Sequence, residues 1–181
     1  MTSPSLKARV DARAGCELDL VGIVLAVSRI PYGRPRTLTS EAVLDEWRGT
    51  CSTKHLLLAD VAGEAWPATS PVLWHRPYLV TRDLAEKRWG PRVAATVAEA
   101  GLVDVHTYAT LALDGRRVDV DVTFPLAGWD GRSDIPLACG GGEDHPGGDD
   151  PILTKADLVR RHCDPGVREP FIAALAVVGW T

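Results

Sequence analysis

Hydrophobic residues follow a helical period in the first part of the chain. Residues 16–30 carry apolar side chains at positions 20, 23, 24, 27 and 30, a spacing that favours a mostly buried helix, although their β-branched content leaves a strand possible. Residues 51–62 are apolar on nearly every side of the helix they predict, so we expect that helix at the centre of the core. Shorter helices are predicted over residues 40–47, 82–89 and 91–100.

After residue 102 the pattern changes to an alternation with a period of two. It flanks Asp114-Gly115, the strongest hairpin signal in the chain. A two-residue loop there pairs Leu113 with Arg116, and this register turns one face toward the core: Thr107, Ala109, Leu111, Leu113, Val118, Val120 and Val122. The other face is polar and is expected to look into a cleft or solvent: His106, Tyr108, Thr110, Asp119, Asp121 and Thr123.

On that polar face His106 and Asp121 are diagonal neighbours. Their Cα atoms are expected about 7 to 8 Å apart, which is within side-chain reach. Asp119 lies one pair further along and is the poorer partner for the histidine.

Two other segments are connections. Residues 66–80 contain three prolines, which exclude a helix, so we expect an irregular or extended stretch. Residues 125–150 are rich in Gly, Pro and Asp and are too long for a passive connector. We expect the glycine- and aspartate-rich residues 139–151 to form a mobile lid over a cleft. A metal site around Cys139 and His145 is disfavoured, because the surrounding glycines provide no rigid geometry.

The chain is expected to form one domain over residues 16–181, after a flexible tail at residues 1–15. Its core covers about residues 20–124, and a loop and helices occupy 125–181. Two helices are predicted at the end of the chain. The first starts near Thr154, where Asp157 completes a capping box, and the second runs over about 167–178.

Composition and charge exclude several classes of protein. With 45% hydrophobic and 24% charged residues, the 181-residue chain is typical of an ordinary globular protein. Its net charge of −4 argues against a nucleic-acid partner. The longest apolar run, residues 20–27, is too short to span a membrane, and a cytoplasmic location is expected. The four cysteines are widely spaced, so we expect no disulfide framework, no zinc site and no cofactor.

Cys51 is the cysteine best placed for chemistry. It falls in the first turn of a predicted helix, where the macrodipole and free N–H groups favour a thiolate. A histidine oriented by a carboxylate is a suitable base for such a nucleophile, which points to His106 with Asp121. His55 lies four residues after Cys51 on the same helix face and is the rival base, but no carboxylate is evident to orient it.

These residues resemble the transglutaminase-like superfamily of cysteine acyl transferases and proteases. The resemblance lies in Gly49-Thr50-Cys51 opening a helix, His106 at a strand start, and Asp121 in the segment VDVDVT. The GTCSTKH sequence and the upstream PYGR at residues 31–34 are similar to a bacterial branch of that superfamily. Tyr108 stands where the family often has a tryptophan in an H-x-W pattern. The resemblance covers about residues 20–124 and implies an α+β, papain-like core in which a central cysteine helix packs on an antiparallel sheet.

Two functions are compatible with this sequence. The first is an enzyme that attacks an amide or ester carbonyl with Cys51, forms a thioester, and passes the acyl group to water or an amine; its substrate is a peptide, a protein or a small amide. In it the Cys51 N–H is one oxyanion donor, while Tyr32 and Arg34, expected to be exposed on the PYGRP turn, bind substrate or complete the oxyanion hole. The second is a non-catalytic module that binds a peptide or small molecule on the same fold.

Overall fold

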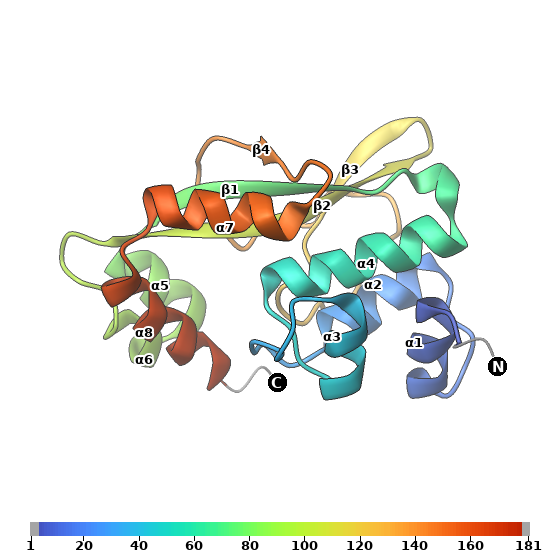
Figure 1. Ribbon diagram of the computed structural model, residues 1–181, viewed down its shortest axis with the longest axis horizontal. Coiled ribbons are helices and arrows are strands. Elements are labelled where there is room, and N and C mark those ends of the chain that lie inside the picture. The colour runs from blue at the N-terminus through green and yellow to red at the C-terminus, as the bar shows by residue number, and fades with distance from the viewer. Residues whose placement is uncertain (1–3, 179–181) are drawn as a thin grey trace.

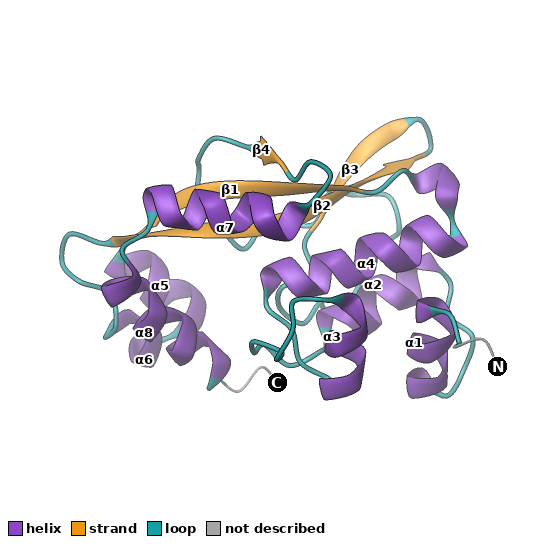
Figure 2. Ribbon diagram, viewed as in Figure 1, coloured by secondary structure: helices purple, strands orange, loops and turns teal. Residues whose placement is uncertain are grey.

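Four antiparallel strands organise the fold. In the computed structural model, which describes residues 4–178, they form one sheet in the order β3-β2-β1-β4. Figure 2 shows that the long β1 and β2 cross the molecule, with helices packed around them. The strands are β1 (Val72–Val80), β2 (Leu102–Leu113), β3 (Arg116–Val120) and β4 (His145–Pro146).

The predicted register of the β2–β3 hairpin is confirmed. Leu113 pairs with Arg116, and the ladder continues to Ala109 opposite Val120. The turn residues Asp114 and Gly115 have φ values of 49° and 78°, the left-handed conformation that this dipeptide accepts readily. Because β3 ends at Val120, the next residue, Asp121, lies where the chain leaves the sheet.

The helices form two groups beside the sheet (Figure 1). The first group contains α1 (Leu6–Ala14), α2 (Leu20–Ser28), α3 (Ser40–Glu46) and α4 (Cys51–Ala65), which is followed by the 3₁₀ turn η1 (Pro67–Thr69). The second group contains α5 (Arg82–Trp89), α6 (Pro91–Ala94) and α8 (Pro165–Ala176). Helix α7 (Pro151–His162) contacts β1, β2 and α4, and the N-terminal end of α4 lies between the two groups.

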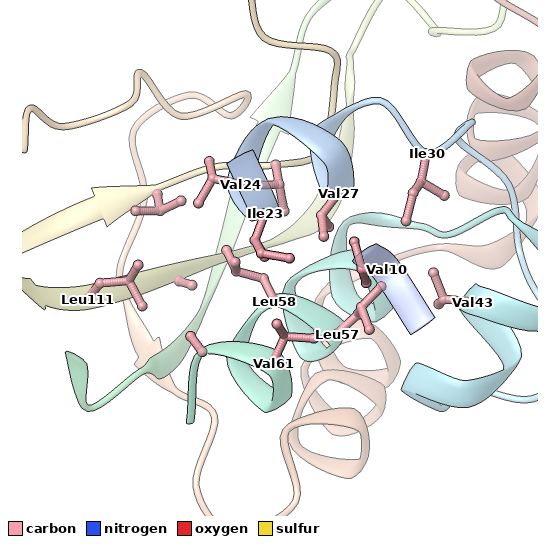
Figure 3. Packing of buried hydrophobic residues seen from close by; sticks show 14 of the residues in the cluster. Val10, Ile23, Val24, Val27, Ile30, Val43, Leu57, Leu58, Val61 and Leu111 are labelled. Carbon is pink, nitrogen blue, oxygen red and sulfur yellow. The ribbon is translucent and has the colours of Figure 1, made fainter. Parts of the chain in front are cut away.

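Helix α4 is the centre of the larger hydrophobic core, as its apolar sequence predicts. Its Leu57, Leu58 and Val61 pack with residues of α2 and with Leu111 of β2 (Figure 3). The fold is therefore α+β, with the cysteine helix packed on an antiparallel sheet. A second core cluster joins Tyr78 and Val80 of β1 to the second group of helices.

Several boundaries differ from the sequence expectations. The expected flexible tail contains α1, because Ser5 caps the helix and Val10 is buried in the core. Residues 72–80 form β1, which is the extended one of the two alternatives expected for this segment. The α7 helix begins at Pro151, with Asp150 accepting the Leu153 N–H, so the proposed capping box at Thr154 is wrong. The predicted helix over 91–100 ends at Ala94.

The 125–150 segment is tied to the edge of the sheet. Two hydrogen bonds of 2.7 Å join the Arg76 guanidinium to the Asp144 carboxylate, and the Gly147 N–H donates to the Leu73 carbonyl at 2.8 Å. A Cβ on Gly142 would meet the Pro77 carbonyl, so only glycine fits against the strand there. Among the described helices, none is long and apolar enough to cross a membrane.

Candidate active site

Cys51 is the first residue of α4, and its side chain is buried, with 5% exposed. Thr50 is the N-cap, as predicted, and its N–H donates to Thr53 Oγ1 at 2.9 Å. The first turn of a helix directs free N–H groups and the positive end of the macrodipole outward. The sulfur therefore sits where a negative charge is stabilised.

The structure brings His106 and Asp121 together. His106 Nε2 lies 2.7 Å from Asp121 Oδ2, and both side chains are buried. The carboxylate also accepts the Thr123 N–H at 2.9 Å and the Ala138 N–H at 2.7 Å. Burial raises the pKa of Asp121, but His106 and these hydrogen bonds hold it well below its usual range, so Asp121 is ionised. Asp119 takes no part, because the charges that act on its carboxylate are those of Asp134, Arg76 and Asp144, and not that of the histidine.

Cys51 completes a chain with this pair. His106 interacts with the Cys51 side chain, and because Nε2 faces Asp121, Nδ1 is the nitrogen left for the sulfur. Burial lowers the pKa of His106, but Asp121 and the Cys51 thiolate raise it well above its usual value. Burial raises the pKa of the Cys51 thiol, but Lys155 and His106 together lower it to about 6. Near neutral pH the two side chains are a thiolate and an imidazolium.

Lys155 is a site residue that the sequence analysis missed. It comes from α7, and its Nζ donates to Cys51 Sγ at 2.9 Å while the side chain is buried. The one signal in the sequence is its place on α7, one turn before the buried Leu158 on the inward face of the helix. A lysine at a buried helix position requires an acceptor or an anion.

The residues around Cys51 hold the start of α4 in place. Lys54 is fully buried, and its ammonium donates to the carbonyls of Ser28, Ile30 and Thr123 at 2.8 to 2.9 Å. A Cβ on Gly49 would stand 2.7 Å from Lys54 Cγ, so glycine lets the chain pass this lysine. Much of the GTCSTKH sequence therefore holds the helix that begins at Cys51 in place.

His55, the rival base, is occupied by the backbone. Its Nε2 accepts the Val122 N–H at 2.9 Å, so the proton is on Nδ1, which donates to the Cys51 carbonyl at 2.6 Å. Burial lowers the pKa of His55 to about 4, which keeps the ring neutral. Both nitrogens are used, so His55 joins α4 to the segment after β3 and has no lone pair to offer the thiol.

A cavity of about 460 Å³ opens onto Cys51. Apolar side chains of α7, Ile152, Ala156 and Val159, form one wall, and Lys155 lies among them. The other described lining residues come from α8 and from the 31–38 and 50–52 segments, and none comes from 125–150. The segment expected to form a lid therefore does not line this cavity.

Tyr32 and Arg34 both line this cavity, but Tyr32 is not exposed as expected. The chain at Pro31–Gly33 pairs with Gly49 through two backbone hydrogen bonds of 3.1 Å, and the Tyr32 ring packs on Phe124 with centroids 5.8 Å apart. These contacts bury Tyr32 beside Cys51. Arg34 remains half exposed and pairs with Glu169 of α8 at 3.2 Å.

Tyr108 lies outside the described lining of the cavity. The Arg76 guanidinium covers its ring at 5.5 Å from the centroid, and burial and the Asp144 carboxylate raise the pKa of its hydroxyl. The polar face of the hairpin is therefore divided: Asp121 holds His106 beside Cys51, whereas Tyr108 lies against Arg76, which holds Asp144 of the 125–150 segment.

Within residues 4–178, no group of three His, Cys, Asp or Glu side chains is arranged to hold a metal ion. Comparison of the chain with protein-family models, curated proteins and solved structures finds no match, so the site is judged on its geometry.

Proposed function

We propose that this protein is a cysteine-dependent acyl transferase or hydrolase that acts on an amide or ester carbonyl through a thioester on Cys51. The observation that carries the proposal is the buried chain from Asp121 through His106 to Cys51, at a helix N-terminus and beside a cavity. The His106–Asp121 pair lies at hydrogen-bonding distance and acts on the Cys51 thiol, which is an arrangement that activates a nucleophile.

In this mechanism Cys51 Sγ attacks the carbonyl carbon as a thiolate. The π electrons move onto the carbonyl oxygen, and the Cys51 N–H at the start of α4 donates to that oxygen. The tetrahedral intermediate collapses, the bond to the leaving amine or alkoxide breaks, and the His106 imidazolium gives it a proton. His106, now neutral, then takes a proton from water or an amine that attacks the thioester, and Cys51 is regenerated.

Asp121 acts through the histidine. Its contact with Nε2 fixes the ring so that Nδ1 faces the sulfur, and its charge stabilises the imidazolium. Because two backbone N–H groups also hold the carboxylate, the ring orientation is set by the fold and not by the substrate.

The transglutaminase-like core belongs to this proposal. It is supported by the order Cys, His, Asp along the chain and by a cysteine helix packed on an antiparallel sheet. Residues 151–176 extend such a core, because α7 and α8 supply much of the cavity wall.

Acylation by p-nitrophenyl acetate tests the proposal. The wild-type protein should release a burst of about one p-nitrophenolate per chain and carry one acetyl group at Cys51, removable by neutral hydroxylamine. Cys51→Ala should abolish the burst and His106→Ala should slow it by about 10²-fold or more, whereas the control Cys163→Ala should leave it intact. A burst that survives in Cys51→Ala contradicts the proposal, and so does its absence from the wild type.

A further inference from the structure

Cys51 is surrounded by titratable groups from five elements and a turn. Among the lysine and arginine side chains there, Lys155 differs in its partner. Arg168 is engaged with Asp104 at 2.7 Å, and Lys54 is engaged with three backbone carbonyls. The Lys155 ammonium is directed at the sulfur itself. The groups that face Cys51 are His106 and Asp104 from β2, Tyr78 from β1, Tyr32 from the turn after α2, Lys54 from α4, Arg168 from α8 and Lys155 from α7.

Lys155 also lies on the side from which a substrate arrives. It lines the cavity together with Cys51, and its neighbours on that wall are apolar. An ammonium next to apolar side chains is poorly screened by water, so its attraction for a nearby anion is strong.

Lys54 is held by three backbone carbonyls and Arg168 by Asp104, so His106 and Lys155 are the cations that face the reacting atoms. At rest the Cys51 thiolate and the Asp121 carboxylate are matched by the His106 imidazolium and the Lys155 ammonium. In the thioester Cys51 and His106 are both neutral, so Asp121 and Lys155 still balance. Between these states the negative charge passes from the sulfur to the substrate oxygen, and both atoms are bonded to the same carbon.

We propose that Lys155 is a catalytic residue, which holds Cys51 as a thiolate and then stabilises the oxyanion that forms when the sulfur attacks. The role rests on the proposed acyl transfer through Cys51. A lysine side chain is long and flexible, and from its position 2.9 Å from Sγ the ammonium follows the charge with a small rotation. Lys155 therefore works beside the Cys51 N–H as a second oxyanion donor.

Two reagents separate the two parts of this role. Iodoacetamide alkylates a thiolate by displacing iodide and forms no oxyanion, so its pH profile measures only the thiolate fraction. p-Nitrophenyl acetate requires the same thiolate and also forms an oxyanion. Dividing the acylation rate by the thiolate fraction at each pH therefore isolates the stabilisation of the oxyanion.

Lys155→Met is the main variant, with Lys155→Gln as a second uncharged one and Lys155→Arg as the charged one. The alkylation midpoint of Cys51 should rise by about one pH unit or more in the two uncharged variants. Their acylation rate per thiolate should fall by about 10²-fold, and Lys155→Arg should recover most of both losses. Lys87→Met, the same change at an exposed lysine, should alter neither.

The outcomes distinguish this role from the proposed function. No burst in the wild type refutes acyl transfer through Cys51 altogether. A wild-type burst with an unchanged rate per thiolate in the uncharged variants refutes oxyanion stabilisation by Lys155, and an unchanged alkylation midpoint refutes its hold on the thiolate. Continued protection of the buried Cys139 from alkylation identifies variants that remain folded.

Discussion

The four cysteines have different environments, and burial alone does not determine the pKa values of their thiols. Cys51 and Cys139 are both buried, but burial raises the pKa of Cys139, whereas Lys155 and His106 overcome burial at Cys51. Burial also raises the pKa of Cys163, to about 11. Cys51 is therefore the buried thiol that ionises near neutral pH, because cations are placed against it.

The alkylation rate of Cys51 should follow pH with a midpoint near 6. A lowered pKa means that the thiolate persists as the pH falls from 9 toward 6 and is lost only below that value. His106→Ala removes a positive charge and a polar partner that both lower this pKa, so the midpoint should move upward by about one pH unit or more. The measurement is the rate of iodoacetamide labelling against pH, with peptide mapping and Cys163 as the internal reference.

An unchanged midpoint in His106→Ala means that Lys155 alone lowers the pKa of Cys51 and that His106 does not act on the sulfur. A Cys51 rate at pH 7 no greater than that of Cys163 contradicts the environment described here for both residues.

Lys54 is important for stability and not for chemistry. Lys54→Met leaves three buried carbonyls without a donor, which should cost about 3 kcal/mol at ~1 kcal/mol for each. Urea unfolding measures this loss. The control Lys87→Met changes an exposed lysine and should leave the unfolding midpoint unchanged; an equal loss in both variants shows that the three contacts do not stabilise α4.

How well the elements could be predicted depended on whether their signals were local. Asp114-Gly115 set the hairpin register, because both residues accept a positive φ, and the register brought His106 to Asp121. The prolines left the segment that contains β1 undecided between an irregular and an extended stretch. A strand tolerates Pro77 because β4 pairs only with Trp74 and His75, so the missing N–H lies beyond that pairing. Local sequence cannot reveal how short a partner strand will be.

The contribution of α7 to the site could not be predicted for the same reason. Lys155 meets Cys51 across 104 positions of sequence. The pattern of α7 predicts a helix with one buried face, but nothing near residue 155 indicates what that face covers. The GTCSTKH segment has a similar limitation: its residues suggested a nucleophile, whereas the contacts of Lys54 and His55 became evident only with their distant partners.

The molecule as a whole depends on the docking of α8 onto the sheet, which closes the cavity. Arg168 donates to Asp104 of β2 at 2.7 Å, and both side chains are buried. Arg168 also reaches Glu169, which pairs with Arg34 from the first half of the chain. Residues far apart in the sequence are thus joined by a buried ion pair at the wall of the cavity.

Breaking this pair from one side should therefore destabilise the fold more than removing it entirely. Asp104→Leu leaves the Arg168 charge buried without its partner and should lower the free energy of unfolding by about 3 kcal/mol. The double variant Asp104→Leu/Arg168→Met replaces both charges by apolar groups and should recover most of that loss. Arg116→Leu, which removes an exposed pair with Asp134, should cost less than about 1 kcal/mol. Urea unfolding of the wild type and the three variants measures these differences. If the double variant is no more stable than Asp104→Leu, α8 is held by the hydrogen bonds of the pair and not by the balance of its charges.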